Sequence, residues 1–258
     1  MRTFPQLPSG AIAQLPMERF ERYRTLKNVL SDGSDVRMSD VGAASVGWNL
    51  QYLDLTAAEA QALQSLFLSS KGRLHTFTFV DPTANLLCWS DELTQPLWNK
   101  DSQLALTQTS APFGAMAATQ IANGAAAAQS IWQTTSAPAG LQYCFSAYLR
   151  SDAPVQVTFE ISGAAVLAAM LTTMWQRWEA TASGGTVDDR SFGLSISPGS
   201  TIQVCGLQAE AQPSAGVYKS TNNPSGVFPN SRFDQDSLDV TATEAGLFAC
   251  SVRVVSPC

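Results

Sequence analysis

Residues that could do acid–base or metal chemistry are few in this chain of 258 residues. His75 is the single histidine, and Asp81 follows it within the stretch SSKGRLHTFTFVDP. A Ser–His–Asp hydrolase would have to use this histidine, but no G-x-S-x-G elbow accompanies it. One histidine is also too few for a His-based zinc site, and no phosphate-binding loop with a lysine occurs. We therefore expect no catalytic residue, no metal site and no cofactor.

Carboxylates leave two other possibilities open. A glycosidase could use two acids across a cleft, and the candidates are Glu160, Glu179, Asp188, Asp189 and Glu210. Asp188 and Asp189, in the turn SGGTVDD, could also bind calcium through their oxygen atoms. Acids in turns and at strand edges are usually only solvated, so we do not interpret the protein as an enzyme.

Aromatic and amide side chains in the second half of the chain fit a third chemistry, the binding of sugars. Flat rings stack on the apolar faces of pyranoses, and amides or carboxylates hold the hydroxyl groups. The residues of these types are Trp132, Trp175, Trp178, Tyr148, Gln208 and Glu210. Trp175 and Trp178 straddle one expected strand, so filling the core is the alternative role for either of them.

The composition excludes several classes of protein. Charged residues are 14% of the chain, against roughly 25% in an average soluble protein, and such a surface suits contact with other subunits or with sugars. The net charge of −6 argues against nucleic-acid binding, because contact with the phosphate backbone needs a positively charged surface. The start MRTFPQLPSG lacks the apolar segment of a secretory signal, and the apolar run 163–171 is too short to cross a membrane. Five cysteines without tight spacing indicate buried free thiols.

Charge also varies along the chain and indicates two modules. Residues 1–100 carry 19 charges and residues 221–258 carry 6, while the 120 residues between them carry 11. We expect one domain to combine residues 1–97 with 222–258, and a second, inserted domain to cover residues 98–221. Charges of both signs gather early in the chain, which is typical of a solvated or interface segment; they are Glu18, Arg19, Glu21, Arg22, Arg24 and Lys27.

Hydrophobic periodicity predicts strands with one helix. Residues 46–53 and 74–80 alternate as strands, and helical spacing begins after Thr56, which forms a capping box with Glu59. Gly72 is placed to end this helix. From about residue 140 short alternating segments follow at regular intervals, as in a β-sandwich or jelly roll. Residues 247–255 form a last strand, which we expect to share a sheet with the first domain.

Two resemblances add to this interpretation. Residues 23–90 resemble the N-terminal region of distal tail proteins of tailed phages and gene transfer agents, in which a helix is followed by a G-R…F-F-x-D-P…N pattern. The matching residues are Gly72, Arg73, Phe77, Phe79, Asp81, Pro82 and Asn85. This resemblance implies a β-rich belt domain that forms a hexameric ring joining the tail tube to the tip hub.

The middle of the chain resembles the carbohydrate-binding-module-like sandwiches of phage tail and fibre proteins. Its marks are the stretches FSAYLRS, WQRWEAT and VCGLQAEAQPSAGVYKST, with matches at Trp175, Gln208, Glu210, Pro213 and Tyr218. Cys205 and Gly206 stand where that pattern has an aromatic residue. Distal tail proteins commonly carry such a sandwich near the C-terminal side of the belt.

Together these observations predict a mainly β protein: a belt-type β-sandwich or barrel with one helix, and an inserted jelly-roll-like β-sandwich. The predicted function is structural, a ring at the virion tail tip, with a peripheral sandwich for contact with host glycans. The implied partners are other copies in a hexamer, the tail tube protein, the tail hub protein and a host surface polysaccharide. The alternatives are a glycan-binding attachment module without a ring role, and a polysaccharide-degrading enzyme.

Overall fold

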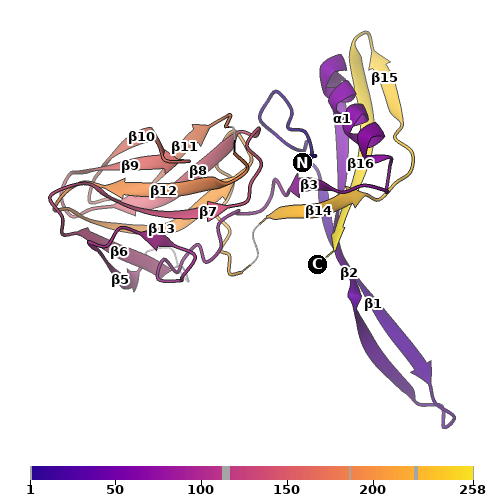
Figure 1. Cartoon of the computed structure of the whole chain (residues 1–258), viewed down its shortest axis with the longest axis horizontal. Helices are drawn as coiled ribbons and strands as arrows, with labels where there is room; N and C mark the ends of the chain where they lie inside the picture. Colours follow the sequence, from indigo (N-terminus) through magenta and orange to yellow (C-terminus); the bar gives the residue numbers. More distant parts are fainter. Residues whose placement is uncertain (1, 112–116, 186, 224–225, 258) are drawn as a thin grey trace. The chain divides into compact units, whose positions relative to one another are not determined.

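The computed structural model describes the chain except residues 1, 112–116, 186, 224–225 and 258. It divides into two compact units, each with its own core (Figure 1). The terminal unit comprises Met1–Phe79 and Phe228–Cys258, and the inserted unit comprises Val80–Val227. Among the described residues the fold is mainly β with one helix, α1, as the sequence predicted. In this part of the chain no helix is long and apolar enough to span a membrane.

The terminal unit is built on a six-stranded sheet with the order β1–β2–β16–β14–β3, in which β15 also pairs with β16. The strands are β1 (Glu18–Val29), β2 (Asp35–Thr56), β3 (Phe77–Val80), β14 (Val227–Phe233), β15 (Val240–Glu244) and β16 (Leu247–Pro257). β16 runs antiparallel to β2, with Val252 opposite Leu50 and Val254 opposite Trp48. All four side chains are buried. The expectation that the last strand shares a sheet with the first part of the chain is therefore confirmed.

Aromatic rings fill the core of the terminal unit. The ring of Trp48 lies 4.6 Å from that of Phe79 and 4.7 Å from that of Phe228, centroid to centroid. Phe77 joins the same cluster, with its ring 4.9 Å from that of Phe233. Phe4, from the N-terminal segment, packs edge-on against Phe79 at 5.3 Å. The strand predicted for residues 74–80 begins at Phe77, so His75 precedes it and lies in the turn after the helix.

Helix α1 (Ala57–Ser70) packs on this sheet through Ala60, Leu63 and Leu66. The Thr56 hydroxyl accepts from the backbone N–H of Glu59, and the Glu59 carboxylate accepts from that of Thr56. The predicted capping box is thus confirmed. At the other end Lys71 and Gly72 both adopt positive φ angles of 52° and 60°, which stop the helical hydrogen-bonding pattern.

The inserted unit is a sandwich of two five-stranded antiparallel sheets, with the strand orders β10–β9–β12–β7–β4 and β11–β8–β13–β6–β5. The first sheet contains β4 (Asn99–Lys100), β7 (Gln129–Thr135), β9 (Val155–Ile161), β10 (Ala164–Leu171) and β12 (Arg190–Ile196). The second contains β5 (Leu104–Ser110), β6 (Ala117–Asn123), β8 (Tyr143–Arg150), β11 (Gln176–Ala182) and β13 (Thr201–Glu210). Phe145 of β8 meets Phe159 and Phe192 of the other sheet at 5.4 and 5.9 Å. Such packing needs one apolar face on each sheet, and the period-two alternation supplies it.

Residues 80–97, which the sequence analysis grouped with the outer domain, cluster with the inserted unit in the structure. Their backbone explains this placement. The N–H of Leu86 donates to the carbonyl of Ala209 on β13 at 2.8 Å, and that of Trp89 donates to Asn222 at 2.9 Å. Leu86 and Leu87 are also fully buried.

Candidate binding surfaces

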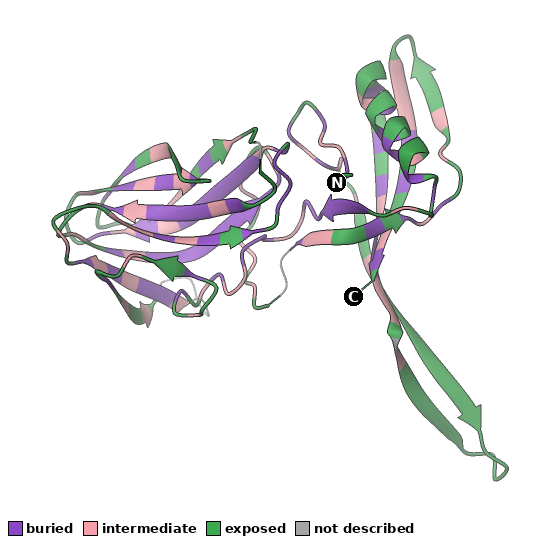
Figure 2. Cartoon of the chain, in the orientation of Figure 1, coloured by how far each residue is buried: buried purple, intermediate pink, exposed green. Residues whose placement is uncertain are grey.

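The clearest unpartnered feature of the terminal unit is a two-stranded ribbon formed by residues 23–40, here called the arm. β1 and the first part of β2 extend beyond the rest of the unit and pair only with each other there (Figure 1). Residues 23–39 are all exposed, which Figure 2 shows as a continuous green segment. The turn at its tip is closed by Asp32, whose carboxylate accepts from the N–H of Ser34 at 2.9 Å.

The base of the arm is fixed to the sheet. The ring of Phe20 lies over Gly47, where an added Cβ would stand only 2.4 Å from it. The Arg22 guanidinium lies 4.7 Å from the centroid of that ring and donates to Asp234 at 2.8 Å. Glycine at position 47 therefore provides the space in which Phe20 anchors the ribbon.

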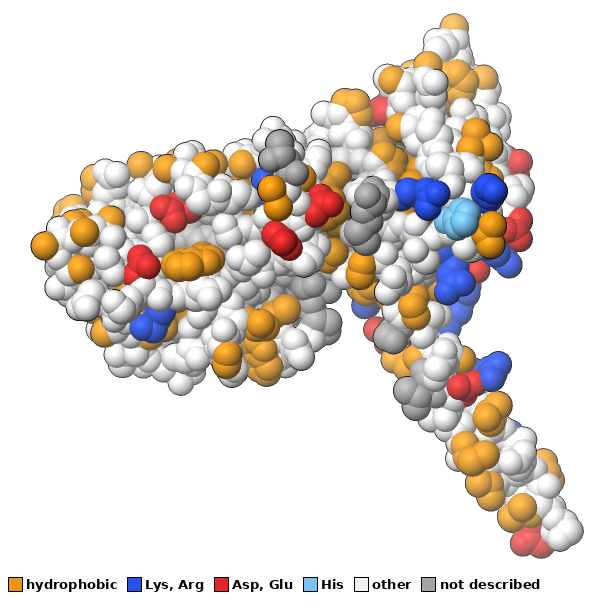
Figure 3. All heavy atoms as spheres, viewed as in Figure 1, with side chains coloured by type: hydrophobic (Ala, Val, Ile, Leu, Met, Phe, Trp, Pro, Cys, Tyr) orange, Lys and Arg blue, Asp and Glu red, His pale blue; other side chains and the backbone are white. Residues whose placement is uncertain are grey.

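The two faces of the arm differ in chemistry. Leu26 stands opposite Met38 and Asn28 opposite Val36, so three apolar side chains share one face. Their exposed fractions are 42% for Leu26, 47% for Met38 and 43% for Val36. Figure 3 shows apolar side chains gathered along this segment. On a free monomer, this face leaves apolar surface in water.

Ion pairs link the charged side chains of the arm, and two of them cross between its strands. Arg24 pairs with Asp40 across the strands, and Lys27 and Arg37 lie 3.4 and 2.9 Å from Asp35. Exposed pairs of this kind contribute only about 0–1 kcal/mol each. The mixed charges, which the sequence analysis interpreted as a solvated or interface segment, thus lie in and beside a ribbon that has no packing partner among the described residues.

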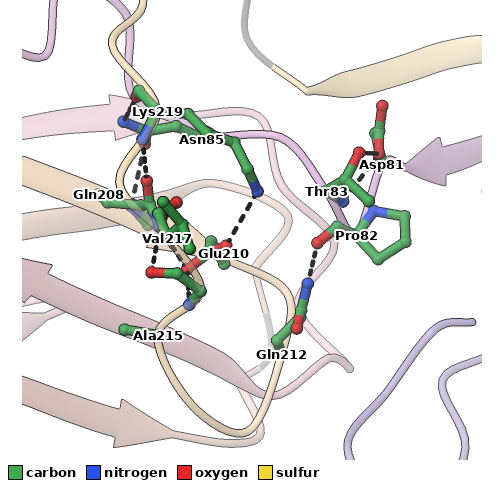
Figure 4. Close-up of polar contacts among 12 residues, drawn as sticks. Asp81, Pro82, Thr83, Asn85, Gln208, Glu210, Gln212, Ala215, Val217 and Lys219 are labelled. Atoms are coloured by element: carbon green, nitrogen blue, oxygen red, sulfur yellow. Dashed lines mark hydrogen bonds and ion pairs between the residues drawn. The ribbon is translucent and has the colours of Figure 1, made fainter. Parts of the chain in front are cut away.

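Two of the predicted sugar-binding residues, Gln208 and Glu210, lie inside the inserted unit and are fully buried. Glu210 accepts from the Gln208 amide at 2.7 Å and from the N–H of Gly216 at 2.8 Å (Figure 4). The Lys219 ammonium stands 3.5 Å from its other oxygen. The Gln208 carbonyl in turn accepts from the N–H of Lys219 at 2.8 Å. Both side chains hold the loop 211–219 in place, a use of the Q-x-E pattern that sequence alone did not reveal.

Tyr148 points to the outer face of the second sheet, and Trp175 directly precedes β11 on the same side. Each ring has a guanidinium near it: Arg177 is 5.5 Å from the Tyr148 centroid and Arg150 is 5.9 Å from that of Trp175. Arg177 also donates to the carbonyl of Gly216 at 2.6 Å. The loop therefore already accepts a hydrogen bond from Arg177, a polar group of this face that a ligand could otherwise use.

The other two tryptophans lie elsewhere. Trp178 stands opposite buried Ala147 and shares its face with buried Ala180, so it lines the edge of the core between the sheets. Trp132 points outward from the first sheet, where it stands opposite Gly193. The structure therefore distributes the six candidates over four environments and does not gather them into one site.

The candidate acids lie in three places. Glu179 and Glu210 both accept from backbone N–H groups of the loop 211–219, at 2.9 and 2.8 Å. Glu160 belongs to the first sheet and Glu179 to the second. Asp188 accepts from the N–H of Ala139 at 2.9 Å and Asp189 from the Ser136 hydroxyl at 3.1 Å, which fixes the neighbouring turn. Among the described residues no group of three His, Cys, Asp or Glu side chains could hold a metal ion.

The described cysteines are free thiols, and three of them are buried. Burial raises the pKa of Cys144 and of Cys205 to about 12, and that of Cys250 to about 11. Cys88 is half-buried, and desolvation raises its pKa as well. Cys258 lies outside the described residues.

Several surface residues were missed by the sequence analysis. The arm had a detectable signal, because a D-G turn between alternating segments is typical of a hairpin. Glu160 was considered only as a catalytic acid, and Asn99 and Gly193 were not considered. Only the pairing of distant strands places these three beside Trp132.

Comparisons with known proteins find likenesses in solved structures only. No protein-family model matches the chain, and no curated protein sequence matches it significantly. A CBM22-1 xylan-binding domain from Paenibacillus barcinonensis Xyn10C is 15% identical over 53% of this chain and 97% of that domain, with a TM-score of 0.42. TmCBM61, solved with β-1,4-galactotriose, is 14% identical over 49% of this chain and 98% of its own, with a TM-score of 0.39.

A third structure comes from a phage. The enzymatically active domain of tailspike protein 4 from bacteriophage CBA120 is 11% identical over 51% of this chain, with a TM-score of 0.40. The match spans only 22% of that tailspike chain. Identities and TM-scores this low decide nothing about function, and the β-sandwich assignment rests on the strand order and core described above.

Proposed function

We propose that the protein is a structural subunit that assembles with copies of itself, as distal tail proteins do, into a ring at the tip of a phage-like tail. In this proposal the ring joins the tail tube to the tail hub, and the inserted sandwich faces outward for contact with host glycans. The hexamer and the tail partners come from the sequence resemblance. The observation that carries the proposal is the exposed arm.

A two-stranded ribbon without a third strand or a packed face is marginally stable in water. The arm also exposes Leu26, Val36 and Met38 on one side. Docking on a partner would cover this face and would supply the packing that the ribbon lacks. The arm therefore fits a subunit that is completed by assembly.

A second copy of the chain is the occupant that fits best. The arm carries both signs of charge within itself, so a strongly acidic or basic partner has no advantage. The terminal unit offers a surface of the same mixed kind: a hollow of about 440 Å³ includes Asp239, Arg253 and the exposed Leu53. Contact of an arm with a different surface on the next copy is head-to-tail and closes into a ring if the rotation permits.

The test compares two pairs of substitutions at neighbouring positions of the arm. Leu26→Ser with Met38→Ser removes the apolar face, while Thr25→Ala with Ser39→Ala changes the adjacent cross-strand pair on the opposite face. Fully burying a leucine or methionine contributes about 1.5–3 kcal/mol, so covering these half-exposed side chains stabilises each interface by about 1–3 kcal/mol. In a closed ring, the Leu26/Met38 variant would lose this stabilisation at every interface.

Light scattering after size-exclusion chromatography should give a multiple of 27.5 kDa for the wild type and for the Thr25/Ser39 variant. The Leu26/Met38 variant should dissociate at the same protein concentration with an unchanged circular dichroism spectrum. A wild type that stays monomeric and also fails to join purified tail tubes would contradict the proposal. If both variants assembled equally well, the apolar face of the arm would not be part of the assembly interface.

A further inference from the structure

The outer face of the first sheet in the inserted unit carries a row of residues that crosses all five strands in register. Asn99 stands opposite Trp132, Trp132 opposite Gly193, Gly193 opposite Glu160, and Glu160 opposite Ala165. Directly opposed residues in a sheet point to the same side. This polar row therefore places an amide, an indole and a carboxylate on one surface.

Gly193 stands in the middle of the row, at a position where the backbone and Trp132 leave no room for a Cβ. An added Cβ would lie 2.7 Å from the Cβ of Trp132 and 2.7 Å from the carbonyl oxygen of Ile131. Gly193 has no positive φ angle, so space and not backbone conformation is what glycine provides here. Because glycine has no side chain, position 193 places no group between Trp132 and Glu160 in the row.

The polar groups of the row are not used within the described chain. Among those residues no hydrogen bond or ion pair engages the Asn99 amide, the Trp132 indole N–H or the Glu160 carboxylate. The opposite outer face differs, because Gln208 and Arg177 there are bonded to the loop 211–219. On the first outer face, an amide and a carboxylate thus stand at the surface without a hydrogen bond to the described residues.

We infer that the polar row is a subsite for a neutral polysaccharide, in which one pyranose stacks on Trp132 and hydroxyls of the bound sugar chain bond to Glu160 on one side and to Asn99 on the other. Strands lie about 4.8 Å apart, so Trp132 and Glu160 are separated by about 10 Å, which a sugar ring with its hydroxyls can bridge. A single aromatic ring among hydroxyls and amides suits a sugar better than the apolar centre of a protein interface. Glu160 accepts hydroxyl donors and repels acidic sugars.

Small hydroxyl side chains extend the surface on both sides of the row. They are Ser130, Thr134, Thr158 and Ser195. Such short side chains keep the face shallow and open to a polymer. This inference gives the glycan contact of the proposed function a site and a ligand class, and it is independent of whether the chain forms a ring.

The experiment measures binding of the full chain by isothermal titration and by affinity gel electrophoresis. The neutral probes are galactomannan, mixed-linkage β-glucan and dextran, and the acidic probe is polygalacturonate. Trp132→Ala should weaken binding to the best neutral probe at least tenfold. Trp175→Ala, a matched change on the other outer face, should bind as the wild type does.

Glu160→Gln is the second variant, since it keeps the size of the side chain and should not disturb folding. It should weaken neutral binding by several fold and reduce the discrimination against polygalacturonate. No binding of any neutral probe, preference for the acidic probe, or loss of binding on Trp175→Ala but not on Trp132→Ala would overturn the inference. The Leu26/Met38 variant should bind sugar normally, so failure of this site and failure of the assembly proposal are separable.

Discussion

Asn85 allows the sharpest test of how the inserted unit is held together. Its side-chain N–H₂ donates to the carbonyls of Leu207 and Lys219 at 2.9 and 3.1 Å. Its carbonyl accepts from the N–H groups of Leu87 and Ala209 at 3.1 and 3.0 Å. The side chain is 1% exposed and connects the segment after β3 with β13 and with the end of the loop 211–219, as Figure 4 shows in part.

We expect Asn85→Ala to lower the free energy of unfolding of the inserted unit by about 4 kcal/mol. Each of the four hydrogen bonds contributes about 1 kcal/mol net, within a range of about 0.5–1.5. Alanine leaves their backbone partners buried without a replacement. For a unit of this size, 1 kcal/mol corresponds to about 2–4 °C in Tm, so the expected drop is about 8–16 °C.

Asn85→Asp separates the two halves of this network. The aspartate keeps an acceptor for Leu87 and Ala209 but turns a second oxygen toward the carbonyls of Leu207 and Lys219. Repulsion and burial favour the protonated carboxyl, so the pKa of this group in the folded variant is raised. Relative to the wild type at the same pH, its stability should therefore be highest below about pH 4, the pKa of an unfolded aspartate, and should fall as the pH rises from that value through the raised pKa of the folded variant.

Urea unfolding followed by tryptophan fluorescence and by calorimetry measures both effects. Asn28→Ala is the control, because Asn28 is exposed in the arm and no hydrogen bond of its side chain occurs within the described residues. It should change stability by no more than about 0.5 kcal/mol. A loss below about 1 kcal/mol for Asn85→Ala, or a stability of Asn85→Asp that rises with pH relative to the wild type, would refute the reasoning.

Two further predictions concern the helix cap and the thiols. Thr56→Ala should destabilise the terminal unit by about 1 kcal/mol in thermal unfolding, whereas Thr56→Ser should not, since serine also accepts from the N–H of Glu59; equal stability of all three proteins would count against the cap. With a pKa of about 12, the thiols of Cys144 and Cys205 are about a thousandfold less ionised at pH 8 than an ordinary cysteine near pH 9. A disulfide reagent should therefore label them slowly at pH 8 in the folded protein and promptly in guanidinium, and rapid labelling of both in the native state would be the opposite result.

Several residues of the sequence pattern that resembles distal tail proteins have a clear structural role in this chain. Asp81 accepts from the N–H and the hydroxyl of Thr83 at 2.8 and 2.7 Å, which forms the turn after β3. Asn85 then ties that turn to β13. Phe77 and Phe79 are fully buried, and Thr78 and Val80 on the other face of β3 are buried too, although the alternation alone would allow a strand with one solvated face. The pattern thus encodes a packed strand followed by an anchored turn.

The amino-acid sequence by itself determined the mainly β class, the single helix with its cap at Thr56, and the inward residues of the sandwich strands. These features are local: the period of apolar residues fixes the element, and the capping box needs only neighbours within one turn. The drop in charge after residue 100 also pointed to a separate module within the chain.

Only the tertiary structure decided which surfaces are covered. A period-two pattern shows that two faces alternate but not which neighbour packs on either, so the arm has the same kind of alternation as a buried strand and yet lies exposed. The alternation likewise could not show that Gln208 and Glu210 are buried, because the loop that covers them comes from later in the chain. The polar row around Trp132 depends on the register of five strands distant in sequence, and register is a property of their pairing.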